Sequence, residues 1–254
     1  MELIDTHCHL QFKDYPAPPK VIAAASQNKV TKLVCVGTTI DDSQRAIELA
    51  AKFKTVWASV GVHPHEAATY ANEKHAAARL KKLLGHPKVV AVGEVGLDLY
   101  KNYSSRADQE KALRLQIETA GHQLPFIFHV RDAWPEFWQI FDSYPKLKGV
   151  VHSFSAQPKQ LEEALSRNLY VGLNGIMTFT KDKLQLEAAK LVPPSKLLLE
   201  TDAPFLTPAP FRGQLCEPKH ILNIAEFLAG LRGQTVEELA KATTSNATAL
   251  FNLK

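Results

Sequence analysis

The sequence predicts a single (β/α)8 barrel that spans residues 1–254, and two observations support this prediction. First, short apolar, β-branched runs alternate with longer segments of helical periodicity, which is the pattern of repeated βα units in a parallel sheet. Second, eight such runs follow one another with no linker or low-complexity segment between them. The runs cover residues 3–9, 32–37, 56–63, 89–93, 125–130, 149–154, 170–175 and 197–201.

Helical segments separate the runs, and the sequence also indicates where some of them begin. The clear cases of apolar residues three or four apart are 41–53 and 105–122, and helices are also expected after the eighth strand, near 218–231 and 235–251. Asp41 is the expected N-cap of the first of these segments, and Ser104 or Ser105 that of the second. An open, doubly wound sheet is the alternative fold, because a count of strands does not by itself establish closure.

Composition restricts the classes of protein to which the chain can belong. The sequence has 45% hydrophobic and 22% charged residues, an ordinary globular balance, and its charge of +4 is too dispersed for nonspecific coating of nucleic acid. Three cysteines are an odd number, so a reducing compartment is expected rather than a disulfide framework. The sequence contains no signal-peptide pattern and no apolar stretch of transmembrane length. We therefore expect a cytoplasmic monomer without a membrane partner.

Polar residues gather at the ends of the predicted strands, where barrel enzymes build their sites. His7 and His9 are two residues apart, so their imidazoles point to one side of the first strand. Glu94 and Asp202 each follow a strongly apolar run, where an unpaired carboxylate would be costly as a purely structural residue.

Three further histidines close strands of their own. His63 ends the third run, His129 the fifth and His152 the sixth. A single histidine in such a position is more often a structural residue, but coincidence at so many strands is improbable. Histidine and carboxylate are the ligands that Zn, Mn and Mg sites use, so the sequence predicts a divalent-metal centre at the carboxyl ends of the strands.

Several motifs in these positions together resemble one family. They are Asp5-Thr6-His7-Cys8-His9-Leu10, Gly61-Val62-His63-Pro64, Gly93-Glu94-Val95-Gly96-Leu97-Asp98, His129-Val130-Arg131-Asp132-Ala133, His152-Ser153-Phe154-Ser155 and Glu200-Thr201-Asp202-Ala203-Pro204-Phe205-Leu206. The chain resembles, nearly end to end, the TatD-type metal-dependent hydrolases of the amidohydrolase superfamily, a deoxyribonuclease family.

The resemblance implies a barrel, two divalent cations (Zn, Mg or Mn) per subunit, and hydrolysis of the phosphodiester bonds of DNA. The implied activity is that of a 3′-5′ exonuclease acting on single strands or 3′ ends. It also implies the metal ligands. One cation would be held by His7, His9, Glu94 and Asp202, and Glu94 would bridge to a second cation on His129 and His152.

The remaining roles follow from the chemistry that phosphodiester hydrolysis requires. Asp202 is expected to accept a proton from the attacking water as general base, and His63 to contact the phosphate or the leaving oxygen. Arg212 and His65 are expected as further substrate contacts. Tyr100 is expected either to stack on a base or to shield the site.

Arg131 is a weaker candidate for a substrate contact, because an ordinary salt bridge to Asp132 or Glu136 would also explain it. One residue departs from the family pattern: Cys216 stands where relatives usually carry Asn. This difference puts in doubt any substrate contact that the Asn makes.

Two other functions stay open at this point. An activated water can also attack a carbonyl, so the alternative enzyme is an amidohydrolase-type hydrolase of a carboxylic ester, lactone, amide or D-aminoacyl-tRNA. A noncatalytic nucleic-acid-binding or partner-binding protein on a relic barrel is the third possibility, although the complete ligand set argues against it.

Overall fold

The computed structural model describes residues 1–101 and 103–253, and each predicted apolar run overlaps a strand. The strands are β1 (Leu3–Cys8), β2 (Val30–Val36), β3 (Val56–Val60), β4 (Val89–Asp98), β5 (Phe126–Arg131), β6 (Gly149–Val151), β7 (Tyr170–Leu173) and β8 (Leu197–Leu199). Most of their residues are buried, as in sheets whose two faces are both covered.

Helices fill the connections between the strands and follow the last of them. They are α1 (Pro18–Gln27), α2 (Ile40–Lys52), α3 (Ala67–Asn72), α4 (Ala76–Leu84), α5 (Arg106–Ala120), α6 (Trp134–Phe141), α7 (Pro158–Ser166), α8 (Lys183–Leu191), α9 (Ile221–Arg232) and α10 (Val236–Phe251). Within the described residues, no helix combines the length and the apolar character needed to cross a membrane.

The order of the strands in the sheet is that of the chain, from β1 to β8. Cys8 of β1 forms a parallel bridge with Ala203, just beyond the end of β8, and the Asp202 N–H donates to the His7 carbonyl at 2.9 Å. The segment that follows the last strand is therefore hydrogen-bonded to the first strand, whereas an open doubly wound sheet would leave both edges unpaired. The structure confirms the (β/α)8 barrel and rejects the open sheet.

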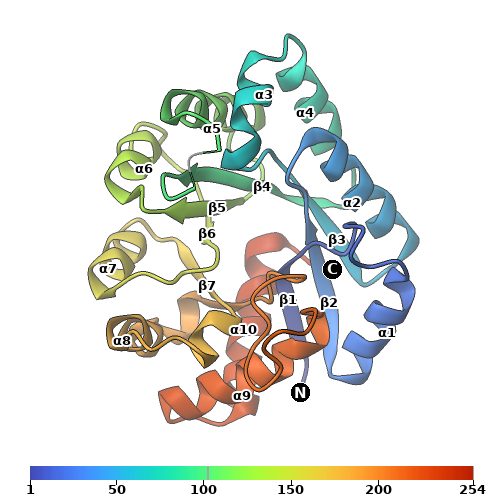
Figure 1. Cartoon of the computed structure of the whole chain (residues 1–254), viewed down its shortest axis with the longest axis vertical. Helices are drawn as coiled ribbons and strands as arrows, with labels where there is room; N and C mark the ends of the chain where they lie inside the picture. Colours follow the sequence, from blue (N-terminus) through green and yellow to red (C-terminus); the bar gives the residue numbers. More distant parts are fainter. Residues whose placement is uncertain (102, 254) are drawn as a thin grey trace. The chain divides into compact units, whose positions relative to one another are not determined.

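The chain divides into two compact units, each with its own set of strands and helices. Unit 1 comprises Met1–Cys35 and His152–Lys254, and in it α10 packs on β1 and β8 (Figure 1). Unit 2 comprises Val36–Val151, and in it α2 packs on β3 while α5 packs on β4, which is buried along its whole length.

Two local predictions are corrected, and one is confirmed. Strand β4 continues through Glu94 to Asp98 because its last residues pair with β5, as far as Asp98 with Arg131, so Glu94 lies within the strand. Asp41 is not the N-cap of α2: the hydroxyl of Thr39 accepts the Asp42 N–H at 3.0 Å. Ser105 caps α5 by accepting the Asp108 N–H at 3.1 Å, as predicted.

Candidate metal centre

Unit 1 brings together His7 of β1, His9 directly after β1, and an aspartate that follows β8. The Nε2 atoms of His7 and His9 are 3.2 Å apart. The Oδ1 atom of Asp202 lies 3.6 Å from His7 Nε2 and 3.4 Å from His9 Nε2. Both histidines are almost completely buried, and the prediction that they face one side of the strand is confirmed. Cys8, between them, points the other way, toward Cys35.

These separations fit the binding of a divalent cation. A tetrahedral ion with ligands at about 2.1 Å holds its ligand atoms roughly 3.4 Å from one another. The three separations among His7, His9 and Asp202 cluster around this value, and the three groups together can hold a metal ion. Two imidazole nitrogens and one carboxylate oxygen form a donor set suited to Zn or Mn.

Hydrogen bonds of Asp5 in β1 with the segment after β8 hold this cluster in place. The carboxylate of Asp5 accepts the Thr201 hydroxyl at 2.6 Å, the Thr201 N–H at 3.0 Å and the His7 N–H at 3.2 Å. Complete burial of Asp5 raises its pKa to about 8, although these hydrogen bonds oppose the rise. These hydrogen bonds therefore fix the backbone of His7 relative to that of Asp202.

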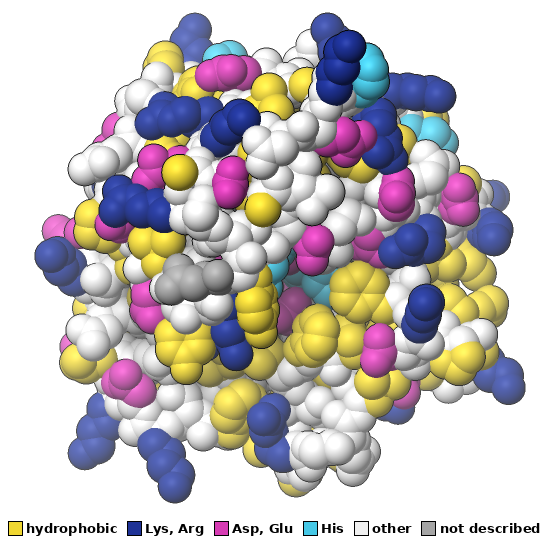
Figure 2. Space-filling model, turned by 45° about the horizontal axis from the view of Figure 1, so that its top comes forward, with side chains coloured by type: hydrophobic (Ala, Val, Ile, Leu, Met, Phe, Trp, Pro, Cys, Tyr) yellow, Lys and Arg dark blue, Asp and Glu magenta, His cyan; other side chains and the backbone are white. Residues whose placement is uncertain are grey.

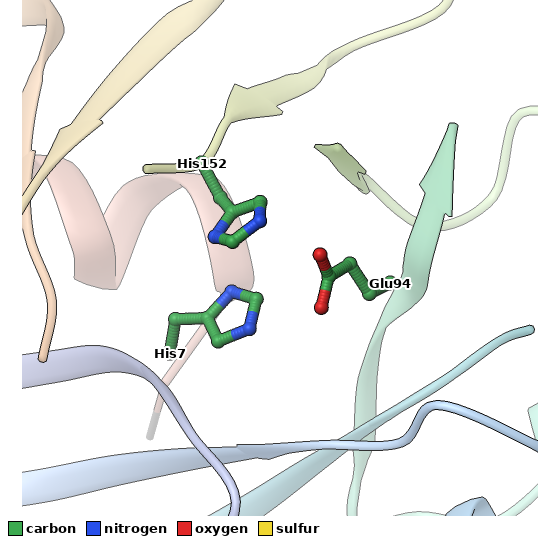
Figure 3. A group of neighbouring side chains, drawn as sticks. All are labelled: His7, Glu94 and His152. Carbon is green, nitrogen blue, oxygen red and sulfur yellow. The ribbon is translucent and has the colours of Figure 1, made fainter. Parts of the chain in front are cut away.

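His152 joins the same cluster from the end of β6. Its ring stacks on the ring of His7, with centroids 4.0 Å apart and planes inclined by 20° (Figure 3). The Nδ1 atom of His152 lies 3.5 Å from Oε1 of Glu200, a buried carboxylate that the sequence analysis did not single out as a site residue. The position of Glu200 after a continuously apolar strand is the signal that would have identified it.

Unit 2 contains a second cluster, formed by Glu94, His129 and His63. Glu94 projects from β4 (Figure 3), His129 lies in β5, and His63 follows β3. Oε1 of Glu94 is 2.7 Å from His129 Nδ1 and 3.3 Å from His63 Nε2. These three residues also form a group that can hold a metal ion.

The surroundings of His63 favour a hydrogen-bond donor over a metal ligand. Its Nδ1 accepts the backbone N–H of His65 at 3.1 Å, so in the neutral ring the proton is on Nε2. Burial lowers the pKa of His63 to about 4, although the nearby Glu94 opposes this, and the ring is neutral at physiological pH. His63 therefore presents an N–H toward Glu94, and the same N–H suits a phosphate or leaving-group oxygen.

Asp98 is a second site residue that the sequence analysis missed. Its Oδ2 lies 2.8 Å from His65 Nε2 and 3.3 Å from His129 Nε2. Burial opposes its ionisation, but hydrogen bonds from His129, the Lys101 backbone and His65 outweigh burial and hold its pKa well below the usual range. Asp98 is four residues beyond Glu94 in one strand and so lies on the same face, a spacing visible in the sequence.

The predicted substrate contacts have different surroundings. Arg212 is exposed, lies 3.7 Å from the ring centroid of Phe179 and donates to the Thr207 carbonyl at 2.7 Å, which engages one of its five N–H groups. Cys216, the departure from the family pattern, is completely buried. A substrate bound at the protein surface therefore does not contact the Cys216 side chain directly.

Tyr100 is 57% exposed, and the guanidinium of Arg131 lies 4.0 Å from its ring centroid. The expected partner Glu136 instead pairs with Arg106. Arg131 thus contacts an aromatic ring, whereas the salt-bridge interpretation had assigned it to a carboxylate.

Charge is scattered over one face of the molecule, in line with the dispersal of Lys and Arg along the sequence. On the face drawn in Figure 2, Lys and Arg side chains are spread out and interspersed with Asp and Glu. A scattered distribution of charge favours recognition of a substrate by a few individual side chains over attraction by an extended basic surface.

Comparison with known proteins shows similarity along nearly the whole chain. The family model of TatD related DNase matches residues 4–252. The chain is 37% identical to an uncharacterized metal-dependent hydrolase, YabD, from Bacillus subtilis (strain 168), with 99% of each chain covered. It is 36% identical to the 3′-5′ ssDNA/RNA exonuclease TatD of Cronobacter sakazakii, with 91% of this chain and 90% of the relative covered.

A solved structure agrees with the fold. The crystal structure of YjjV, a TatD homolog from Escherichia coli K12, superposes with a TM-score of 0.91 at 29% identity and covers 98% of both chains. Structures at 12–14% identity, among them N-acetyl-D-glucosamine-6-phosphate deacetylase from Mycobacterium smegmatis and a protein engineered from a lactonase template, share the fold with TM-scores of 0.59–0.64.

Proposed function

This chain belongs to the TatD related DNase family, and we propose that it is a metal-dependent deoxyribonuclease that hydrolyses phosphodiester bonds from the 3′ end of single-stranded DNA. The observation that carries the proposal is the convergence of His7, His9 and Asp202, whose ligand atoms are spaced as around one small cation. The exonuclease name of the Cronobacter relative supports a nucleic acid as substrate.

The proposed metal ligands are those that the resemblance to the family implies. His7, His9, Asp202 and Glu94 are the proposed ligands of one cation, and Glu94, His129 and His152 those of the other. All come from the carboxyl ends of barrel strands or from the residues that follow them, where enzymes of this fold place their catalytic groups. When bound, the two divalent cations supply Lewis acidity and a water of lowered pKa.

Side chains of the protein accept the proton of the water and donate a hydrogen bond to the leaving group. Burial opposes ionisation of Asp202, but the hydrogen bond from His9 and the nearby His7 and His152 hold its pKa below the usual value. Asp202 is therefore ionised at neutral pH and accepts the proton of the attacking water as general base. His63 donates a hydrogen bond from Nε2 to the leaving oxygen, and Arg212 and His65 bind phosphate oxygens.

The test of the function is cleavage of 5′-labelled single-stranded DNA by protein stripped with a chelator and then resupplied with Mg, Mn or Zn. We expect no cleavage after stripping, and stepwise shortening from the 3′ end when one of the metals is restored. A strand blocked at its 3′ terminus is the matched control and should stay intact. Rapid hydrolysis of esters or lactones by metal-loaded protein that leaves DNA untouched would refute the nuclease.

Tyr100 is proposed to stack on a base of the substrate, with Arg131 beside it available to a phosphate. A stacked base contributes about 1–3 kcal/mol, so Tyr100→Leu is expected to raise KM for single-stranded DNA about tenfold. Tyr100→Phe keeps the ring and should behave as wild type. Turnover of the small phosphodiester bis(p-nitrophenyl) phosphate should be the same in all three proteins, and an unchanged KM for DNA in Tyr100→Leu would exclude stacking.

A further inference from the structure

Glu200 is a buried carboxylate with an unusual environment in unit 1. It follows β8 and has no exposed surface, in a position where an ionised group loses its hydration. Among the described residues, no Lys or Arg lies within salt-bridge distance of it; the basic side chain at 3.5 Å is that of His152. A fold does not need a carboxylate in such a place for packing alone.

The hydrogen bonds of Glu200 all involve one oxygen. Oε1 accepts the backbone N–H of Ser153 at 2.5 Å and the side-chain amide of Asn174 at 3.4 Å, and it lies 3.5 Å from His152 Nδ1. Oε2 is buried and has no hydrogen-bond partner in the described structure. The carboxylate is thus aimed at the turn that carries His152, and its contacts lie on that side.

The neighbouring strand leaves room for this carboxylate. Gly172 lies in β7, and a Cβ atom there would be 2.4 Å from Glu200 Oε2 and 2.9 Å from its carboxyl carbon. Any side chain at position 172 would therefore displace the Glu200 carboxylate. A substitution at Gly172 therefore moves the carboxylate without changing the residue at position 200.

We propose that Glu200 is a positioning residue that orients His152 as a metal ligand; this rests on the proposed function only through the role of His152. A carboxylate beside Nδ1 selects the tautomer with the proton on that nitrogen, which leaves the lone pair on Nε2 for a cation. It also fixes the ring in its stack against His7. Asn174 holds Oε1 and the Ser153 hydroxyl at once, which keeps the carboxylate from rotating away.

The test compares Glu200→Gln and Gly172→Ala with wild type in the full-length protein. Glu200→Gln replaces the carboxylate by a neutral amide, whereas Gly172→Ala keeps the carboxylate of Glu200 and displaces it. Gly230→Ala is the matched control, because a Cβ at that helical position meets no atom within 4 Å. The readouts are the Mn²⁺ affinity by calorimetry without DNA, and the imidazole ¹⁵N spectrum, which reports the tautomer of His152.

Both variants are expected to bind one of two Mn²⁺ ions roughly 10–100-fold more weakly and to lose the Nδ1–H signal of His152, while Gly230→Ala matches wild type. If Glu200→Gln does not fold, Gly172→Ala carries the test alone. Folded variants with wild-type Mn²⁺ affinity and an unchanged His152 tautomer would overturn the positioning role. A wild-type protein that binds two Mn²⁺ ions but cleaves no DNA would instead refute the nuclease and leave this role intact.

Discussion

Glu94→Gln is expected to lower kcat/KM for DNA cleavage by on the order of 10³-fold, which corresponds to about 4 kcal/mol of transition-state stabilisation. Glu94 is almost completely buried, and its Oε1 atom lies 2.7 Å from His129 Nδ1 and 3.3 Å from His63 Nε2. Gln preserves the volume but removes the negative charge that the proposed bridging position requires. The cation affinity of the variant should fall together with its activity.

The measurement is single-turnover cleavage of labelled DNA at saturating Mn²⁺, alongside calorimetric titration of Mn²⁺. Glu110→Gln is the control, because Glu110 lies in α5 and pairs with the exposed side chain of Arg106. It should retain full activity. A Glu94→Gln protein that binds two Mn²⁺ ions with wild-type affinity would show that Glu94 is not a bridging ligand.

Asp202→Asn is expected to lower kcat on the order of 10²–10⁴-fold, the range that a positioned general base contributes. Asn keeps an oxygen for a cation or for His9, but it cannot accept a proton. Since the pKa of Asp202 is held below its usual value, the wild-type carboxylate is already ionised at neutral pH. The loss in the variant should therefore persist across the neutral range and should not be recovered by raising the pH.

A second titration separates the two roles proposed for Asp202. If Asp202→Asn binds cations like wild type and still loses turnover, the defect lies in proton transfer; a matching fall in affinity would assign it to ligation. Asp14→Asn, an exposed carboxylate in the same unit, is the control. Wild-type kcat in Asp202→Asn would remove the residue from the mechanism.

The sequence determined the fold class and indicated the residues that we propose as metal ligands. Apolar runs and helical periodicity are local properties of a chain, so they indicate strands and helices before any tertiary contact is known. The barrel then places the end of each parallel strand at one edge, which is why histidines and carboxylates at those ends pointed to a site. His7, His9 and Asp202 do converge in the structure.

The tertiary structure decided what each side chain does, because hydrogen-bond partners lie far apart in the sequence. Asp5 and Thr201 are 196 residues apart, yet their bond holds His7 near Asp202. The donor role of His63 follows from a single backbone N–H, and the extra length of β4 follows from its pairing with β5. The contact of Asp98 with His129, and the proximity of Glu200 to His152 on which its proposed positioning role rests, exist only once the chain has folded.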